Sequence, residues 1–211
     1  EPFSNCYTGI YKIHRNLYKN SYGNKVVFEE TNEDLGITFR YQWNSSEQYG
    51  FIRKSTISNT TGSEIKITVL DGVQNIMPFG INSDLQNEYS NLVDAYKKNE
   101  LEPEIGLGIY ALSAIIVDKA EPSEALKATT VWSTGIENAQ YLVSSLQLDA
   151  FRKGETITQE IAIKAEKGAY FVHSDMTLLP HADKSWIIVA DVNQSIVDIS
   201  KISEKIKNEK N

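Results

Sequence analysis

Residues 35–43 of the chain read Leu-Gly-Ile-Thr-Phe-Arg-Tyr-Gln-Trp. Apolar and aromatic side chains occupy every second position from residue 37, and polar side chains lie between them. Successive side chains of a β-strand point to opposite faces of the sheet, so this period of two predicts a strand with one apolar and one polar face. The apolar face comprises Ile37, Phe39, Tyr41 and Trp43, and the polar face comprises Thr38, Arg40 and Gln42.

Short β-rich runs recur on both sides of this strand. The predicted strands cover residues 25–30, 35–43, 49–58, 64–70, 106–118, 125–132, 156–165, 169–178 and 186–192. Residues 50–70 are predicted to form a hairpin with its turn at residues 60–63. Asp71-Gly72 is predicted to end the second strand of that hairpin as a further turn, and Gly168 is predicted to be the turn between two later strands.

Helical spacing is found in three segments. Residues 84–98 are predicted to form an amphipathic helix that is capped by Ser83 and carries Lys97 and Lys98 at its carboxyl end. A short helix is predicted over residues 145–153, with Gly154 directly after it. Residues 194–209 carry four isoleucines at helical spacing on an otherwise polar segment, which predicts a helix that docks on a neighbouring element.

The order of these elements predicts the fold class. A parallel sheet needs a helix after nearly every strand, and such helices are missing here. Many short strands with occasional helices instead favour an all-β fold, an antiparallel β-sandwich with a few helices.

Composition excludes several function classes. The chain has 211 residues, a net charge of −7 and one cysteine, Cys6. The negative charge argues against nucleic acid as a partner, since its binding needs a basic surface. One cysteine excludes an internal disulfide framework and a multi-cysteine zinc site.

No apolar run approaches the length of about 18 residues that a membrane helix needs, so no membrane partner is expected. The chain starts at Glu1 rather than Met and ends within a polar segment, so we expect it to be part of a larger protein. A cytoplasmic and a periplasmic location both stay open.

The sequence contains no familiar catalytic pattern. It lacks a phosphate-binding loop, a dinucleotide fingerprint and a nucleophile elbow. Gly106 and Gly108 lie in a predicted strand, where close packing of the backbone explains them better than ligand binding. His14, His173 and His181 show no metal-ligand spacing. We therefore assign no catalytic residue, no metal and no cofactor.

Five aromatic residues are candidates for stacking on the apolar faces of sugar rings. They are Tyr41, Trp43, Tyr49, Trp132 and Trp186. Packing in the core is the alternative for each of them. Trp186 precedes Ile-Ile-Val, which favours the core. Polar residues flank Trp43 and Trp132, so both interpretations stay open there.

Three segments carry a more specific pattern in a fixed order. They are Arg40-Tyr-Gln-Trp43, Gly50-Phe-Ile-Arg-Lys-Ser-Thr-Ile-Ser-Asn59 and Val69-Leu-Asp-Gly-Val-Gln-Asn-Ile-Met-Pro78. This set resembles the N-terminal β-sandwich of the cellobiose phosphorylase-like proteins, glycoside hydrolase family 94 and its large uncharacterised relatives. Later segments that resemble the same relatives are Ser90-Asn-Leu-Val-Asp-Ala-Tyr-Lys97, Ala120-Glu-Pro-Ser-Glu-Ala125 and Thr129-Thr-Val-Trp132. The resemblance covers residues 25–192.

The resemblance implies a galactose mutarotase-like antiparallel β-supersandwich over residues 1–193. It implies that residues 194–211 begin a helical linker to an (α/α)₆ barrel of the same polypeptide, which would hold the catalytic acid. The parent protein would be a glycoside phosphorylase or hydrolase. The implied partners are that barrel, an oligosaccharide and a second copy of the chain.

The leading hypothesis is a non-catalytic, carbohydrate-binding-type sandwich domain. Its candidate binding residues are Arg40, Trp43, Arg53, Asp71, Gln74, Asn75 and Trp132. Turn formation is the alternative role for Asp71, Gln74 and Asn75. Two other hypotheses stay open. A stand-alone sugar epimerase-like enzyme needs histidines and a carboxylate to converge in one pocket. A purely structural interaction module would expose an apolar patch near residues 196–206.

Overall fold

Antiparallel strands make up most of the chain, which confirms the prediction of an all-β fold with a few helices. The computed structural model describes residues 1–4, 9–114 and 126–210. Cys6 and the segment Ala120–Ala125 lie outside the described residues. The chain divides into two compact units. Unit 1 comprises Glu1–Val69, Ser133–Asn138 and Ser174–Val189, and unit 2 comprises Leu70–Trp132, Ala139–His173 and Ala190–Asn211.

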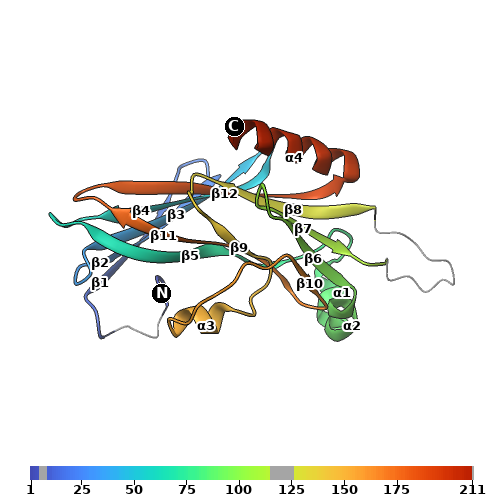
Figure 1. Cartoon of the computed structure of the whole chain (residues 1–211), viewed down its shortest axis with the longest axis horizontal. Coiled ribbons are helices and arrows are strands. Elements are labelled where there is room, and N and C mark those ends of the chain that lie inside the picture. The colour runs from blue at the N-terminus through green and yellow to red at the C-terminus, as the bar shows by residue number, and fades with distance from the viewer. Residues whose placement is uncertain (5–8, 115–125, 211) are drawn as a thin grey trace. The chain divides into compact units, whose positions relative to one another are not determined.

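Unit 1 is built on four consecutive strands that lie side by side in the order β1-β2-β3-β4, followed by β12 (Figure 1). Their bounds are β1 Ile13–Lys19, β2 Lys25–Asn32, β3 Ile37–Ser46, β4 Gly50–Asn59 and β12 Asp183–Ser195. In this register Arg40 lies opposite Glu29 of β2 and Thr56 of β4. Four of these strands confirm the predictions for residues 25–30, 35–43, 49–58 and 186–192, whereas β1 is an addition.

The two faces of β3 differ as the alternation predicts. On the apolar face, the rings of Phe28 and Tyr41 are stacked with 4.7 Å between their centroids. The rings of Phe39 and Trp186 lie 6.3 Å apart, so Trp186 is a core residue with 1% exposure. The opposite face is polar and carries Arg40.

The predicted hairpin over residues 50–70 is wrong. β4 lies between β3 and β12, whereas β5 (Ile65–Ile76) pairs with β11 (Gly168–Leu178) in a second sheet of order β5-β11-β9. The buried side chain of Asn59 fixes this connection. Its amide donates to the backbone carbonyls of Ser63, Leu178 and Leu179, and its oxygen accepts from the backbone N–H and the hydroxyl of Thr61. These five bonds, rather than a hairpin turn, set the direction of the chain.

The predicted turns at Asp71-Gly72 and at Gly168 are also wrong. Asp71 and Gly72 lie inside β5. A Cβ atom on Gly72 would lie 2.0 Å from the carbonyl oxygen of Tyr170, so glycine is needed here for close approach to β11. Gly168 begins β11, and the preceding strand β10 (Ala162–Lys164) pairs with β6 instead.

Unit 2 contains a second run of strands in the order β12-β8-β7-β6-β10. The bounds of the remaining strands are β6 Lys97–Glu102, β7 Leu107–Leu112, β8 Lys127–Thr134 and β9 Gln140–Leu142. In the part of the chain that the structure describes, the helices are α1 Ser83–Glu88, α2 Ser90–Ala95, α3 Leu148–Arg152 and α4 Ile196–Lys210. The predicted strands over residues 106–118 and 156–165 are shorter than expected, and residues 115–118 lie outside the described part of the chain.

Tyrosines pack closely against glycines in part of the interior of unit 2. The hydroxyl of Tyr110 donates to the Ala169 carbonyl and that of Tyr170 donates to the Gly106 carbonyl, each over 2.6 Å. A Cβ atom on Gly108 would lie about 3 Å from both tyrosine side chains. This confirms close packing as the role of Gly108, which lies in β7. Gly106 instead lies in the turn before β7 with a φ of +70°, so the strand predicted at this residue is wrong, although a Cβ atom at Gly106 would also overlap the Tyr141 ring.

The predicted helix over residues 84–98 is divided into α1 and α2, and the chain then continues as strand β6 from Lys97. Asn82, rather than Ser83, caps α1, since its side chain accepts from the Leu85 N–H over 2.7 Å. The ammonium of Lys97 is buried and donates to Gln86 and Asp94 over 2.6 and 2.8 Å. Lys97 therefore joins β6 to both helices instead of ending a single helix.

The other two predicted helices are confirmed. α3 is followed by Gly154, which has a φ of +74°. α4 docks through the buried side chain of Ile206, which is 3% exposed. It also contacts Glu102 at the end of β6, which accepts from the Ser203 hydroxyl and forms an ion pair with Lys207. In the described residues, no helix is both long enough and apolar enough to cross a membrane.

Candidate functional site

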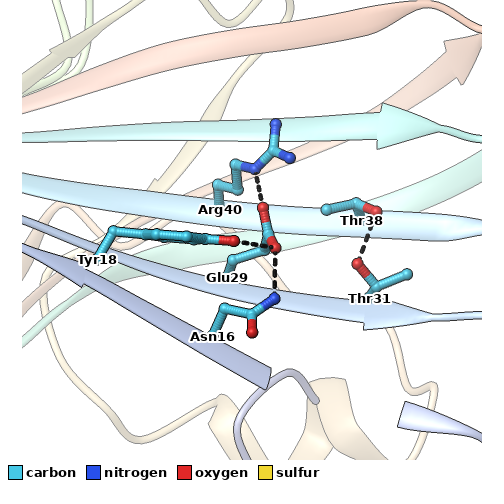
Figure 2. Close-up of polar contacts among 6 residues, drawn as sticks. All are labelled: Asn16, Tyr18, Glu29, Thr31, Thr38 and Arg40. Carbon is cyan, nitrogen blue, oxygen red and sulfur yellow. Dashed lines mark hydrogen bonds and ion pairs between the residues drawn. The ribbon is translucent and has the colours of Figure 1, made fainter. Parts of the chain in front are cut away.

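A carboxylate lies at the centre of a polar cluster on the polar face of β1, β2 and β3 (Figure 2). One oxygen of Glu29 accepts from the Asn16 amide over 2.9 Å and from the Tyr18 hydroxyl over 3.1 Å. The other oxygen accepts from Nε of Arg40, which also forms an ion pair with Glu29. We call these four residues the Glu29 cluster.

The register of the strands brings the cluster together. Asn16 lies directly opposite Glu29, and Glu29 lies directly opposite Arg40. Opposed residues of antiparallel strands point to the same face, and so does a residue two positions further along a strand. Tyr18 reaches the cluster for this second reason. On the same face, the hydroxyls of Thr31 and Thr38 lie 3.0 Å apart (Figure 2).

The cluster holds Glu29 in its ionised form. Burial alone would raise the pKa of Glu29, because this residue is only 6% exposed. Hydrogen bonds from Asn16, Arg40 and Tyr18, together with the positive charge of Arg40, outweigh burial and hold the pKa below its ordinary value. The hydrogen bond to Glu29 raises the pKa of the Tyr18 hydroxyl above its ordinary value, because ionised Glu29 favours the protonated phenol.

This shift predicts a stability effect that depends on pH. A lowered pKa in the folded chain stabilises it fully above the pKa of unfolded glutamate, and this contribution is lost as pH falls through the folded pKa. Glu29→Gln should therefore lower the free energy of unfolding at neutral pH, and its difference from the parent should shrink at acid pH. Urea unfolding between about pH 3 and about pH 7 measures this. The exposed Glu47 provides the control Glu47→Gln, and an equal pH profile for the two variants would contradict the assignment.

The cluster is suited to binding rather than to proton transfer. Glycoside chemistry uses two carboxyl groups about 5 to 9.5 Å apart, one of which is protonated in most mechanisms. The Glu29 cluster contains one carboxylate, and three donors hold it ionised. Its remaining surface offers a phenol ring, an amide and a guanidinium to a ligand.

The seven predicted site residues are divided between the two units, and the three in unit 1 do not share one face of the sheet. Arg40 belongs to the Glu29 cluster. Trp43 and Arg53 are cross-strand neighbours on the opposite, apolar face. Arg53 is 6% exposed, lies over the Tyr41 ring at 4.6 Å and donates to the Ser55 hydroxyl over 2.9 Å. Arg53 is thus part of the interior of unit 1.

The other four predicted residues belong to unit 2. Asp71 and Trp132 are buried, with 8% and 9% exposure. Gln74 and Asn75 are exposed near the end of β5, where Asn75 has a φ of +56°. Within unit 2, therefore, the two exposed amides are the accessible members of the predicted set.

Sequence reasoning missed Asn16, Tyr18 and Glu29. The segment of β1 reads Ile-His-Arg-Asn-Leu-Tyr-Lys, which has no apolar alternation, so no strand is predicted there. Glu29 stands beside Glu30 in the sequence, but the two side chains lie on opposite faces. Glu30 accepts from Nε of Arg15 over 2.7 Å and Glu29 accepts from Arg40. The signal available in the sequence is that each of these two glutamates can pair with an arginine of a neighbouring strand, Glu29 with Arg40 and Glu30 with Arg15.

The histidines of unit 1 do not converge. His14 lies in β1, where its ring pairs with Glu33 over 2.8 Å. His181 directly precedes β12, four strand spacings away, or about 19 Å at about 4.8 Å per spacing. His173 belongs to unit 2 and contacts Gln140. Among the described residues, no group of three histidines, cysteines or acids could hold a metal ion. The epimerase-like hypothesis lacks the convergence that it requires in unit 1.

The start of α4 exposes two apolar side chains. Ile196 is 77% exposed and Val197 is 56% exposed, whereas Ile206 is buried. The patch expected for an interaction module near residues 196–206 is thus limited to the first turn of the helix.

Comparisons with known proteins leave the family open. No family model matches the chain, and no curated protein matches it. One similar solved structure is the heparan sulfate lyase HepC from Pedobacter heparinus, with a TM-score of 0.41, 7% identity, and coverage of 87% of this chain and 22% of that chain. A heparinase III has a TM-score of 0.39 at 8% identity and coverages of 89% and 22%.

A third similar structure is the 4-alpha-glucanotransferase from Thermococcus litoralis, with a TM-score of 0.29, 13% identity, and coverage of 83% of this chain and 22% of that chain. The chain therefore spans about a fifth of the length of each of these proteins. At these identities and TM-scores the likeness carries no argument about activity.

Proposed function

We propose that this chain is a saccharide-binding, non-catalytic β-sandwich domain of a larger carbohydrate-active protein. The observation that carries the proposal is the Glu29 cluster, in which Asn16, Tyr18 and Arg40 converge on the Glu29 carboxylate on one face of the sheet (Figure 2) and the Tyr18 side chain is half-exposed. Sugar hydroxyls bind amides, guanidinium groups and carboxylates, and the apolar face of a sugar ring packs on an aromatic ring.

Preorganisation supports the same proposal. Asn16, Tyr18 and Arg40 are all held by hydrogen bonds to one buried carboxylate. A ligand therefore meets side chains whose conformational freedom is already reduced, which lowers the entropic cost of binding. Further hydroxyls continue along the face, where Thr56 lies opposite Arg40 and its hydroxyl is 2.8 Å from that of Ser185.

The finer part of the proposal rests on the resemblance to the N-terminal sandwich of the cellobiose phosphorylase-like proteins and glycoside hydrolase family 94. On this proposal the fold is a galactose mutarotase-like supersandwich, and α4 begins the linker to an (α/α)₆ barrel. The parent protein is then a glycoside phosphorylase or hydrolase, and a second copy of the chain is a further partner. The motifs that support it lie on β3, β4 and β5.

Binding of oligosaccharides by the isolated chain tests the proposal. Isothermal titration with neutral and acidic oligosaccharides at millimolar concentration should give measurable heat for at least one of them. Tyr18→Ala should weaken that binding about tenfold, which corresponds to about 1.4 kcal/mol, because the stacking ring is lost. Tyr22 lies outside the cluster and is 88% exposed, so Tyr22→Ala should leave the affinity unchanged. If no saccharide gave measurable heat of binding, the proposal would be contradicted.

A further inference from the structure

We infer that the Glu29 cluster binds an acidic saccharide, with Arg40 receiving the carboxylate of a uronic acid unit. This inference rests on the proposed function and names its ligand class. It starts from the hydrogen bonds that Arg40 makes and from those that it leaves open.

Glu29 occupies one edge of the guanidinium of Arg40. A guanidinium has five N–H donors, and Glu29 takes the one on Nε. Among the described residues, the two terminal nitrogens of Arg40 have no hydrogen-bond partner, and the side chain is 50% exposed. Figure 2 shows both terminal nitrogens directed away from Glu29. The chain therefore presents a fixed, open fork of N–H groups on the sheet surface.

A carboxylate is the ligand group that fits this fork. Its two oxygens match two parallel N–H donors, and charge-assisted pairs of this kind are about twice as strong as neutral hydrogen bonds. Glu29 acts here as a positioning residue, since it limits the rotation of Arg40 without covering its terminal nitrogens. Sugar hydroxyls could use the same N–H groups, but without the parallel two-oxygen geometry and the charge assistance that a carboxylate brings.

A second cation compensates for the charge of Glu29. Lys54 of β4 lies opposite Gln42, which is two positions from Arg40 on β3, so Lys54 and Arg40 are diagonal neighbours on one face. The side chain of Lys54 is exposed and has no ion-pair partner within the described ranges. Arg40 and Lys54 together carry two positive charges, and Glu29 carries one negative charge. The resulting net positive charge of one favours an anion as the ligand.

The surroundings distinguish a sugar acid from a small anion. Tyr18 and Arg40 bind the same carboxylate, so the phenol ring and the fork lie close enough for one sugar unit to contact both. Tyr18 is 51% exposed and supplies the apolar contact that a free inorganic anion cannot use. The expected ligand is thus an oligosaccharide that carries carboxylates.

The test compares acidic saccharides with their uncharged esters. Trigalacturonate and trimannuronate are titrated into the intact chain beside their full methyl esters. At least one acid should bind about tenfold or more tightly than its ester, and Arg40→Gln should abolish this difference. Arg40→Lys should not restore it, because an ammonium lacks the fork. Lys54→Gln should weaken binding of the acid severalfold and leave that of the ester unchanged.

Arg152→Gln provides a matched control, since Arg152 is a partly exposed arginine of α3 in unit 2. Circular dichroism and thermal unfolding show whether each variant keeps the fold. Equal binding of acid and ester that is insensitive to Arg40→Gln would overturn the inference and leave the proposed function standing. Poly-glutamate that competes as well as the saccharide would also overturn it. The absence of binding by every acidic and neutral saccharide would overturn both.

Discussion

Replacing Gly72 with alanine will lower the free energy of unfolding by about 3 kcal/mol or more, at the upper end of the range for overpacked interiors. A Cβ atom at this position would lie 2.0 Å from the carbonyl oxygen of Tyr170 and 2.8 Å from the Cα atom of Phe171. These are backbone atoms of the paired strand β11, so no side-chain rotation can relieve the overlap. β5 and β11 would have to move apart and lose hydrogen bonds of the sheet.

Chemical denaturation measures this effect, and Gly62→Ala is its matched control. A Cβ atom on Gly62 would have no heavy atom within 4 Å, and Gly62 is exposed in the connection after β4. Its replacement should leave stability unchanged or raise it by about 0.4 to 1 kcal/mol, because alanine reduces the freedom of the unfolded chain. Equal denaturation midpoints for Gly72→Ala and the parent would show that β5 and β11 do not approach as closely as described.

Replacing Glu160 with alanine will cost about 4 kcal/mol of stability, given about 1 to 3 kcal/mol for each buried donor that loses its partner. Glu160 is 7% exposed. One of its oxygens accepts from the backbone N–H groups of Val143 and Ser144, each over 2.8 Å. The other accepts from the Ser144 hydroxyl over 3.0 Å and from the Gln147 amide over 2.9 Å. Truncation removes all four acceptor contacts.

Two further variants isolate the role of these hydrogen bonds. Glu160→Gln retains one carbonyl oxygen for the two backbone donors and should lose about half as much stability as Glu160→Ala. Glu155→Ala removes an exposed carboxylate nearby in the sequence and should change the free energy of unfolding by less than about 0.5 kcal/mol. If Glu160→Ala proved no more harmful than Glu155→Ala, then Glu160 would not be the residue that holds residues 143–147.

The alternation of residues 37–43 predicts β3 and its two faces, because the direction of successive side chains depends only on the strand itself and needs no distant partner. The pair Asp71-Gly72 misleads for a physical reason. Glycine serves turns through its backbone freedom and serves close strand approach through its missing Cβ, and the two uses look alike in sequence. The residue that distinguishes them is Tyr170, far along the chain.

The candidate site shows the same limit. Arg40 is predicted from its own segment, but Asn16, Tyr18 and Glu29 become its neighbours only through the register of three strands. The prediction of a single helix over residues 84–98 is wrong for another reason. The apolar spacing of this segment fits one continuous helix. The chain ends α2 before Lys97 because that side chain is buried between Gln86 and Asp94. Long-range partners of this kind are not encoded in local periodicity.

The buried amide of Asn59 has a consequence for producing the protein. Asn59-Thr-Thr matches the acceptor pattern for N-linked glycosylation in a eukaryotic secretory pathway. Its nitrogen, the atom that a glycan would join, donates to three backbone carbonyls and is closed off in the folded chain. A glycan could be attached only before residues 59–63 close, and it would then prevent closure. In such a host, Asn59 glycosylation would mark molecules that failed to fold.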